Sequence, residues 1–341
     1  MRIFIAAIIF FVNFSAAVAA ITIEEQRDFG NGPRLVRVLS TIDTDIIAPV
    51  IEGFLEAAPD FRIEYGTANT QDVFDAIGTE QNSYDIVISS AMDLQMKLAN
   101  DGFAQPVSSA AIRALPNWAR WRDVLVAIAQ EPVVAVLNRD AFAGLGIPQT
   151  RADLAAILRT HPDRFRNKLG TYDPVRSGAG YLFASQDARY SDTFWRLAEI
   201  MGGLRVQLYT TSSAMIDDVK TGKIAVAYNV VGSYAMAHLS GNSDVQLVEF
   251  RDFTHILLRT ALVPVSATHA DNAAVFLDYL VSDAGQKSID ELAKLPRISE
   301  ESLIARPHQK PIRLDPGLLV YVDPIKRKNF LSEWMAAVLQ P

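Results

Sequence analysis

Hydroxyl, amide and glycine residues gather where predicted strands run into the next helix. Five segments have this character: 40–45, 89–93, 173–180, 209–213 and 228–234. Ligands of open α/β sheets bind beside the carboxyl ends of the strands, where backbone N–H groups and helix N-termini point into the crevice. Any one segment is equally well explained as a helix cap, because Ser, Thr and Asp are common caps. Five together favour a polar ligand held by hydroxyls and backbone N–H groups.

The chemistry of these segments suits an anion such as a phosphate, a phosphonate or a carboxylate. A helix N-terminus carries partial positive charge. In the third segment, which opens at Asp173, Arg176 would add a bidentate guanidinium contact. A surface ion pair is an equally good interpretation of Arg176. We count both residues among the predicted ligand-binding residues.

Enzyme motifs are not found in the chain. It has no G-x-S-x-G, H-E-x-x-H or G-x-x-x-x-G-K pattern. With no Cys, thiolate metal sites, Cys nucleophiles and disulfides are excluded, and the five His residues lack metal-ligand spacing. We therefore predict a protein that is not an enzyme, with no catalytic residues, no bound metal and no cofactor. A secreted enzyme on the same fold is the competing class.

Ferric iron is an alternative ligand, because it prefers anionic oxygen donors. Tyr228 and Tyr234 would supply phenolates, and Asp173 and Glu131 carboxylates. The two tyrosines stand six residues apart, and the crevice segments hold no adjacent Tyr pair. The sequence therefore favours an organic anion over iron.

The N-terminus predicts export. A basic Met1-Arg2 start precedes an apolar run from Ile3 to Phe14, followed by small residues up to Ala20. This pattern is typical of a signal peptide, and the run is shorter than the roughly 20 residues of a membrane-spanning helix. We predict residues 1–20 as a signal peptide cleaved near Ala20, and a periplasmic location. The formal net charge of −7 and the lack of a basic stripe argue against a nucleic-acid partner.

Alternating strand-like and helix-like segments must position the polar residues. Strands are predicted at 34–39, 61–65, 84–89, 132–137, 223–228, 244–250 and 257–264, and helices at 45–57, 70–77, 151–158, 192–201, 270–280, 283–292 and 327–338. The order βαβαβ at the start implies a mostly parallel sheet covered by helices. About 320 mature residues exceed what one hydrophobic core usually holds.

We therefore predict an α/β protein of two lobes. Each lobe has a mostly parallel sheet flanked by helices, and a two-strand hinge joins them. The extended segments 131–138 and 258–266 are the predicted crossings. Lobe 1 would comprise residues 34–132 plus 265–341, and lobe 2 residues 133–264. We expect a monomer.

Several segments resemble type II periplasmic binding proteins, in the branch of ferric-iron, sugar-phosphate and phosphonate binders. They are Tyr84–Asp93, Tyr172–Tyr181, Gly222–Asn229 and Leu314–Arg327, and the resemblance spans nearly the whole mature chain. It implies two α/β lobes with the ligand enclosed at the hinge. The residues that match the family's motifs, and that would line this cleft, are Thr41, Ser89, Ser90, Ser177, Gly178, Thr211, Ser212 and Tyr228. Where iron-binding members have paired tyrosines, this chain reads Asn-Val-Val-Gly-Ser-Tyr at 229–234, which favours an organic anion.

The resemblance also implies a role and partners. We predict capture of a small phosphorylated or carboxylated compound by closure of the lobes, and delivery to an ABC importer through its inner-membrane permease. The ending at 314–327 is similar to that of solute-binding proteins that work beside sensor kinases. The alternative partner is therefore the periplasmic domain of a two-component histidine kinase, with this chain as its ligand-sensing co-receptor.

Overall fold

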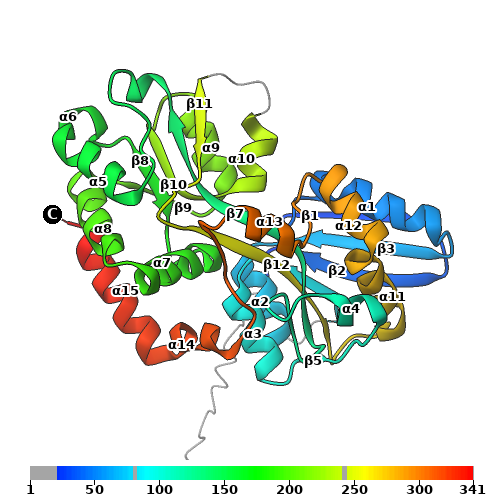
Figure 1. Cartoon of the computed structure of the whole chain (residues 1–341). Coiled ribbons are helices and arrows are strands. Elements are labelled where there is room, and N and C mark those ends of the chain that lie inside the picture. Colours follow the sequence, from blue (N-terminus) through cyan, green and yellow to red (C-terminus); the bar gives the residue numbers. More distant parts are fainter. Residues whose placement is uncertain (1–20, 80–82, 240–243, 341) are drawn as a thin grey trace, which may run out of the picture.

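The computed structural model describes residues 21–79, 83–239 and 244–340, and in it the chain forms two α/β lobes side by side (Figure 1). The predicted signal peptide, residues 1–20, lies outside the described residues. No helix in the described part of the chain is long and apolar enough to cross a membrane. The two-lobed α/β fold predicted from the sequence is confirmed.

The first lobe is built on three parallel strands whose apolar residues are buried. These are β2 (Arg34–Ser40), β3 (Phe61–Thr67) and β4 (Ile86–Ser89), in the order β3-β2-β4. The smaller strands beside them are β1 (Glu25–Gly30), β5 (Ala104–Gln105), β6 (Arg120–Trp121) and β13 (Gln309–Pro311). The helices of this lobe are α1 (Thr44–Ala57), α2 (Thr70–Gly78), α3 (Met92–Asn100), α4 (Ala110–Ala114), α11 (Ala270–Val281), α12 (Asp283–Glu291) and α13 (Glu300–Ala305).

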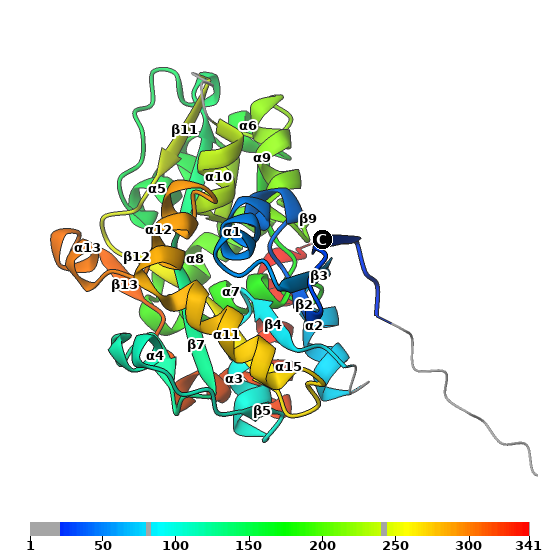
Figure 2. The same cartoon turned by 90° about the vertical axis from the view of Figure 1, so that its right-hand side faces the viewer.

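Helices cover both faces of this sheet, as its apolar strands require. Residues of α1, α11 and α12 pack on one face in a single buried cluster. Figure 2 views the lobe from the side that these three helices cover. Residues of α2 and α3 pack on the other face, in a cluster that continues into the second lobe.

The second lobe repeats the arrangement. Its parallel strands are β8 (Leu169–Tyr172), β9 (Gln207–Tyr209) and β10 (Val226–Val231), and β11 (Val245–Val248) pairs antiparallel on β7. The helices of this lobe are η1 (Asp140–Phe142), α5 (Arg151–Thr160), α6 (Pro162–Phe165), α7 (Gly178–Tyr190), α8 (Thr193–Gly203), α9 (Ser212–Lys220) and α10 (Gly232–Leu239).

Two long antiparallel strands, β7 (Leu125–Asn138) and β12 (Thr254–Pro264), join the lobes. The first half of β7 pairs with β12 from Val126 to Pro132, and its second half pairs with β10 and β11 of the second lobe. Residue 131 therefore stands where the chain passes from one sheet to the other. Side chains alternate between the two faces of a strand, so consecutive residues here point to opposite sides of the connection.

The C-terminal segment makes a third connection. It comprises η2 (Pro316–Leu318), α14 (Leu319–Val322) and α15 (Pro324–Val338). Helix α14 packs on α3 of the first lobe, whereas α15 packs on α8 of the second, through a cluster that includes Phe330 and Trp334. The predicted lobe boundaries stay a prediction, and this packing argues against placing the last helix, 324–338, with lobe 1.

Candidate functional site

A cavity of about 580 Å³ lies between the two lobes, at the carboxyl ends of the parallel strands. One side of it comes from the first lobe and from β12: Glu24, Thr41, Asp43, Ala68, Asn69, Thr70, Gln71, Asp72, Ser90 and Arg259. The other side comes from the second lobe: Tyr172, Val175, Arg176, Ser177, Ala179, Thr210, Thr211, Ser212, Ser213, Val231 and Tyr234. Its volume falls within the roughly 300–1,000 Å³ typical of small-molecule sites.

Two helices of the second lobe begin at this cavity. Ser177 caps α7, where its Oγ accepts a hydrogen bond from the Gly180 N–H (3.1 Å), and Thr211 caps α9 by accepting from the Ala214 N–H (3.3 Å). The Ser212 hydroxyl is 2.5 Å from the Tyr172 hydroxyl and accepts from the Val231 N–H. We call Ser177, Thr210, Thr211, Ser212 and Ser213 the hydroxyl wall. The N-terminal ends of both helices give it partial positive charge.

Arg259 supplies a buried cation at the cavity. Its Nε lies 2.7 Å from Glu131 Oε1, and its Nη2 lies 3.3 Å from Oε2. Burial alone would lower the pKa of this guanidinium, but Glu131 outweighs it and holds the pKa above its usual value. The remaining nitrogen, Nη1, reaches the Thr41 carbonyl and hydroxyl oxygens at 3.3 and 3.4 Å. Glu131 thus fixes two nitrogens of Arg259, and the third sits beside a cavity-lining threonine.

Carboxylates stand on the first-lobe side of the same cavity. Glu24, Asp43 and Asp72, which we call the acidic wall, all line it. Burial, together with the charges of Asp43 and Asp72, raises the pKa of Glu24 above its usual value. Glu24 is therefore close enough to both aspartates for their charges to act on it.

Direct hydrogen bonds cross the cavity between the lobes. The Gly178 N–H, in the first turn of α7, donates to Thr70 Oγ1 of α2 (3.0 Å). The Tyr234 hydroxyl of α10 lies 3.3 Å from both the Thr41 carbonyl oxygen and Asp43 Oδ1. A Cβ added at Gly178 would come within 2.8 Å of Thr70 Oγ1, so the absence of a side chain there permits the close approach.

Most of the predicted ligand-binding residues are brought together here. The cavity is lined by Thr41, Ser90, Arg176, Ser177, Thr211 and Ser212, and Gly178 borders it through the hydrogen bond to Thr70. Ser89 and Asp173 do not line it. The buried Ser89 hydroxyl accepts from the Ala91 N–H, and Asp173 accepts from the Val175 N–H within its own turn.

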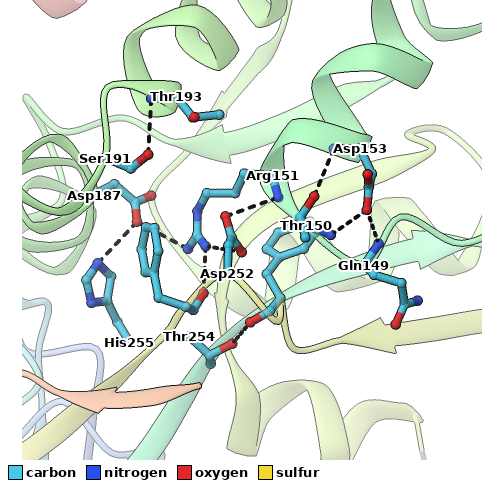
Figure 3. Close-up of polar contacts among 12 residues, drawn as sticks. Gln149, Thr150, Arg151, Asp153, Asp187, Ser191, Thr193, Asp252, Thr254 and His255 are labelled. Carbon is cyan, nitrogen blue, oxygen red and sulfur yellow. Dashed lines mark hydrogen bonds and ion pairs between the residues drawn. The ribbon is translucent and has the colours of Figure 1, made fainter. Parts of the chain in front are cut away.

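Tyr228 also lies away from the cavity, because its side chain leaves β10 on the face that packs against α5 and α7. It belongs to a buried polar network around Arg151. Its hydroxyl lies 2.7 Å from Arg151 Nε and donates to Asp187 Oδ2, also 2.7 Å away. Figure 3 shows Arg151 between Asp187 and Asp252, with His255 on the other side of Asp187. The network ties the start of β12 to the core of the second lobe.

The charge state of this network is fixed by its pairing. Burial would raise the pKa of the Asp187 carboxyl, but Arg151, His255 and the Asn229 amide lower it to about 2. Burial raises the pKa of the Tyr228 phenol well above its usual value. A buried phenol that already donates to Asp187 is a structural group, and the structure places Tyr228 in this network and not at the cavity.

Arg259, Tyr172 and the acidic wall are not predicted from the sequence as ligand-site residues, and Tyr234 is predicted only as a possible iron ligand. Arg259 had a recognisable signal, because it is the one charged residue in the apolar run from Ile256 to Leu262. A buried charge needs a partner, and the partner is Glu131 in the predicted crossing strand. The acidic wall had no comparable signal, because Glu24 and Asp72 lie outside the five polar segments and Asp43, within the first, reads equally well as a helix cap.

The possible iron ligands are not gathered. Tyr234 lines the cavity, whereas Tyr228 and Asp173 do not, and Glu131 is held by Arg259 and by the Ser233 hydroxyl. Within the residues that the structure describes, no group of three or more His, Asp or Glu side chains is arranged to hold a metal ion.

Comparisons with known proteins place the chain among binding proteins. Residues 36–291 match the family model of the bacterial extracellular solute-binding proteins. A solved structure of the substrate binding protein of an ABC transporter from Agrobacterium tumefaciens is 32% identical, covers 93% of this chain and 98% of its own, and has a TM-score of 0.87. No curated protein sequence matches.

Two more distant structures share the fold. The periplasmic binding protein AfuA from Actinobacillus pleuropneumoniae, solved with fructose-6-phosphate, has a TM-score of 0.73 at 15% identity over 90% of this chain and 99% of its own. Iron-bound HitA from Pseudomonas aeruginosa has a TM-score of 0.69 at 16% identity over 89% of this chain and 99% of its own.

Proposed function

The chain belongs to the bacterial extracellular solute-binding proteins, and from that premise we propose that it captures a small anionic solute between its lobes for an ABC importer. The solute would be a phosphorylated or carboxylated organic compound. The protein would act in the periplasm after cleavage of residues 1–20 near Ala20, as a monomer, and would release its solute unchanged.

One observation carries the proposal of an anion. The N-termini of α7 and α9, the hydroxyl wall, Arg176 and the buried Arg259 all meet at one cavity. Backbone N–H groups and a helix dipole favour negative charge, and a guanidinium adds charge-assisted hydrogen bonds.

Closure of the lobes would retain the solute. A ligand that contacts both walls binds the closed arrangement more tightly and shifts the population toward it. Hydrogen bonds from Gly178 to Thr70 and from Tyr234 to Thr41 are available only when the walls are close. The permease would then recognise the closed surface. Delivery to an ABC importer is supported by the Agrobacterium relative, which is the substrate binding protein of an ABC transporter. A phosphorylated solute is supported by the more distant AfuA structure, which holds fructose-6-phosphate.

A thermal-shift screen tests the proposal. Residues 21–341 would be unfolded and refolded to remove carried-over ligand, then screened with sugar phosphates, phosphonates, di- and tricarboxylates, amino acids, polyamines and ferric iron. A ligand at 100 times its dissociation constant adds about 2.7 kcal/mol, which raises the midpoint by several degrees. We expect the largest shift from a phosphorylated or carboxylated compound. A shift with iron alone would contradict the proposal.

A further inference from the structure

The acidic wall carries negative charge that the described residues do not neutralise. None of Glu24, Asp43 and Asp72 forms an ion pair with a described Lys, Arg or His, although sixteen such pairs occur elsewhere. Their hydrogen-bond donors are neutral: the Tyr234 hydroxyl for Asp43, and the Thr22 N–H and the Asn69 amide for Asp72. Asp43 at the N-terminus of α1 and Asp72 in the first turn of α2 are each favoured by a helix dipole, but neutral donors and dipoles leave the formal charge of three carboxylates in place.

The opposite side of the cavity has the opposite polarity. It presents the hydroxyl wall, two helix N-termini and Arg176, and no carboxylate. Arg259 lies on the same side as the acidic wall, and Glu131 holds two of its nitrogens. A plain anion bound there would be attracted by one side and repelled by the other. A solute with a cationic group at its far end would turn that repulsion into attraction. The attraction would grow on closure, because exclusion of water lowers the effective dielectric constant.

We infer that the solute is a zwitterion, with a phosphate or carboxylate group on the hydroxyl wall and a protonated amine on the acidic wall. This inference rests on the proposed function and names the class of solute within it. It also gives the acidic wall a role in specificity, since an otherwise identical solute without the amine would be disfavoured.

Pairs of compounds that differ only in one amine test the inference. They are O-phosphoethanolamine with ethyl phosphate, glucosamine 6-phosphate with glucose 6-phosphate, and β-alanine with propionate. Each dissociation constant would be measured by isothermal titration calorimetry on refolded residues 21–341. An exposed ion pair changes affinity by a factor of roughly 1.5 to 5. With more than one carboxylate acting, we expect the amine-bearing compound to bind about tenfold more tightly in at least one pair.

A charge-neutralised variant separates the electrostatic effect from misfolding. Glu24→Gln with Asp43→Asn should weaken the amine-bearing compound about two- to tenfold and tighten its partner by a similar factor. Asp72 is left unchanged. The tested chain begins at Ile21, and the next residue, Thr22, donates its N–H to Asp72. The terminal ammonium of Ile21 therefore lies near Asp72 and would complicate the interpretation of a change there. The matched control, Glu52→Gln with Glu56→Gln, makes the same charge change on exposed positions of α1 away from the cavity, and should change neither compound's affinity.

The outcomes distinguish this inference from the proposed function. If plain anions bind as tightly as their amine-bearing partners in every pair, the inference is wrong and the proposed function stands. If no member of any pair binds, the inference is wrong, and the thermal-shift screen alone decides the proposed function. If the variant shifts both members of a pair in the same direction, the acidic wall does not select for an amine, and the inference is again wrong.

Discussion

The pair of Arg259 and Glu131 offers the sharpest test of how the cavity is built. Both side chains are almost completely buried, and they are joined by two contacts of 2.7 and 3.3 Å. Removing one member of such a pair leaves the other charge buried without a partner, which costs about 3–5 kcal/mol. Arg259→Met should therefore destabilise the protein by about that amount, and Glu131→Gln by a comparable amount.

The double variant Arg259→Met with Glu131→Gln should recover much of this loss. Neutral groups of similar volume often replace a buried pair at little cost, so we expect a net loss of about 1–2 kcal/mol. Urea unfolding followed by the fluorescence of the four Trp residues measures all three values. If Arg259→Met costs less than about 1 kcal/mol, or if the double variant is no more stable than either single one, the two side chains do not form a buried ion pair and the reasoning fails.

The same variants report on ligand binding. Arg259→Met should weaken solute binding about 10- to 100-fold, because a hydrogen bond to a charged group contributes about 1.5–3 kcal/mol. The recovered stability of the double variant should not recover affinity, because the cation at the cavity is still missing. Calorimetry with the best compound from the thermal-shift screen measures this. Wild-type affinity in the double variant would mean that Arg259 does not contact the solute.

Three further predictions concern closure and pH. Gly178→Ala should weaken solute binding about tenfold with little change in stability, because the added methyl meets Thr70 across the cavity; calorimetry and unfolding together check this, and unchanged affinity would contradict it. Burial raises the pKa of Asp93 to about 7, so the folded state loses stability as pH rises from about 4 to 7. Asp93→Asn should thus be about 2–4 kcal/mol more stable than wild type at pH 8 and equal to it at pH 4, and equal midpoints at both pH values would refute the assignment. The pKa of Asp187 is lowered to about 2, so its contribution of about 2 kcal/mol is present above pH 4 and lost as pH falls through 2; Asp187→Asn should flatten this acid limb of the stability curve, and an unchanged limb would point to other carboxylates.

The elements of the fold could be predicted from apolar periodicity, because most of them bury one face. The predicted helix at 70–77 is α2 (Thr70–Gly78), and that at 270–280 is α11 (Ala270–Val281). The strand at 132–137 is only the second half of β7 (Leu125–Asn138), because Gln130, Glu131 and Pro132 interrupt the apolar run between its two halves. The strand at 223–228 begins later, at Val226, because Gly222 turns the chain at a positive φ of 71°.

The residues that line the cavity could be predicted only in part, because the sequence does not say to which side of a strand a given side chain points. Thr41, Ser177 and Ser212 follow strands, and the ends of parallel strands meet at one edge whatever the details of packing. Tyr228 stands on a strand, so the face of β10 on which it lies decides whether it meets the solute or Arg151. That face depends on the register with β7, which shifts between Ala227 and Val230 and cannot be read from a single sequence.

Capture of an anion by closure of the lobes is tested most directly by the distance between them. The chain has no Cys, so Glu56→Cys and Arg159→Cys place one spin label on an exposed position of each lobe. Pulsed electron paramagnetic resonance would give the distance distribution with and without the compound that produces the largest thermal shift. We predict a broader or longer distribution without it, and a single narrow distance when the phosphorylated or carboxylated compound is bound. A distribution that does not change on saturation with a bound anion would contradict capture by closure.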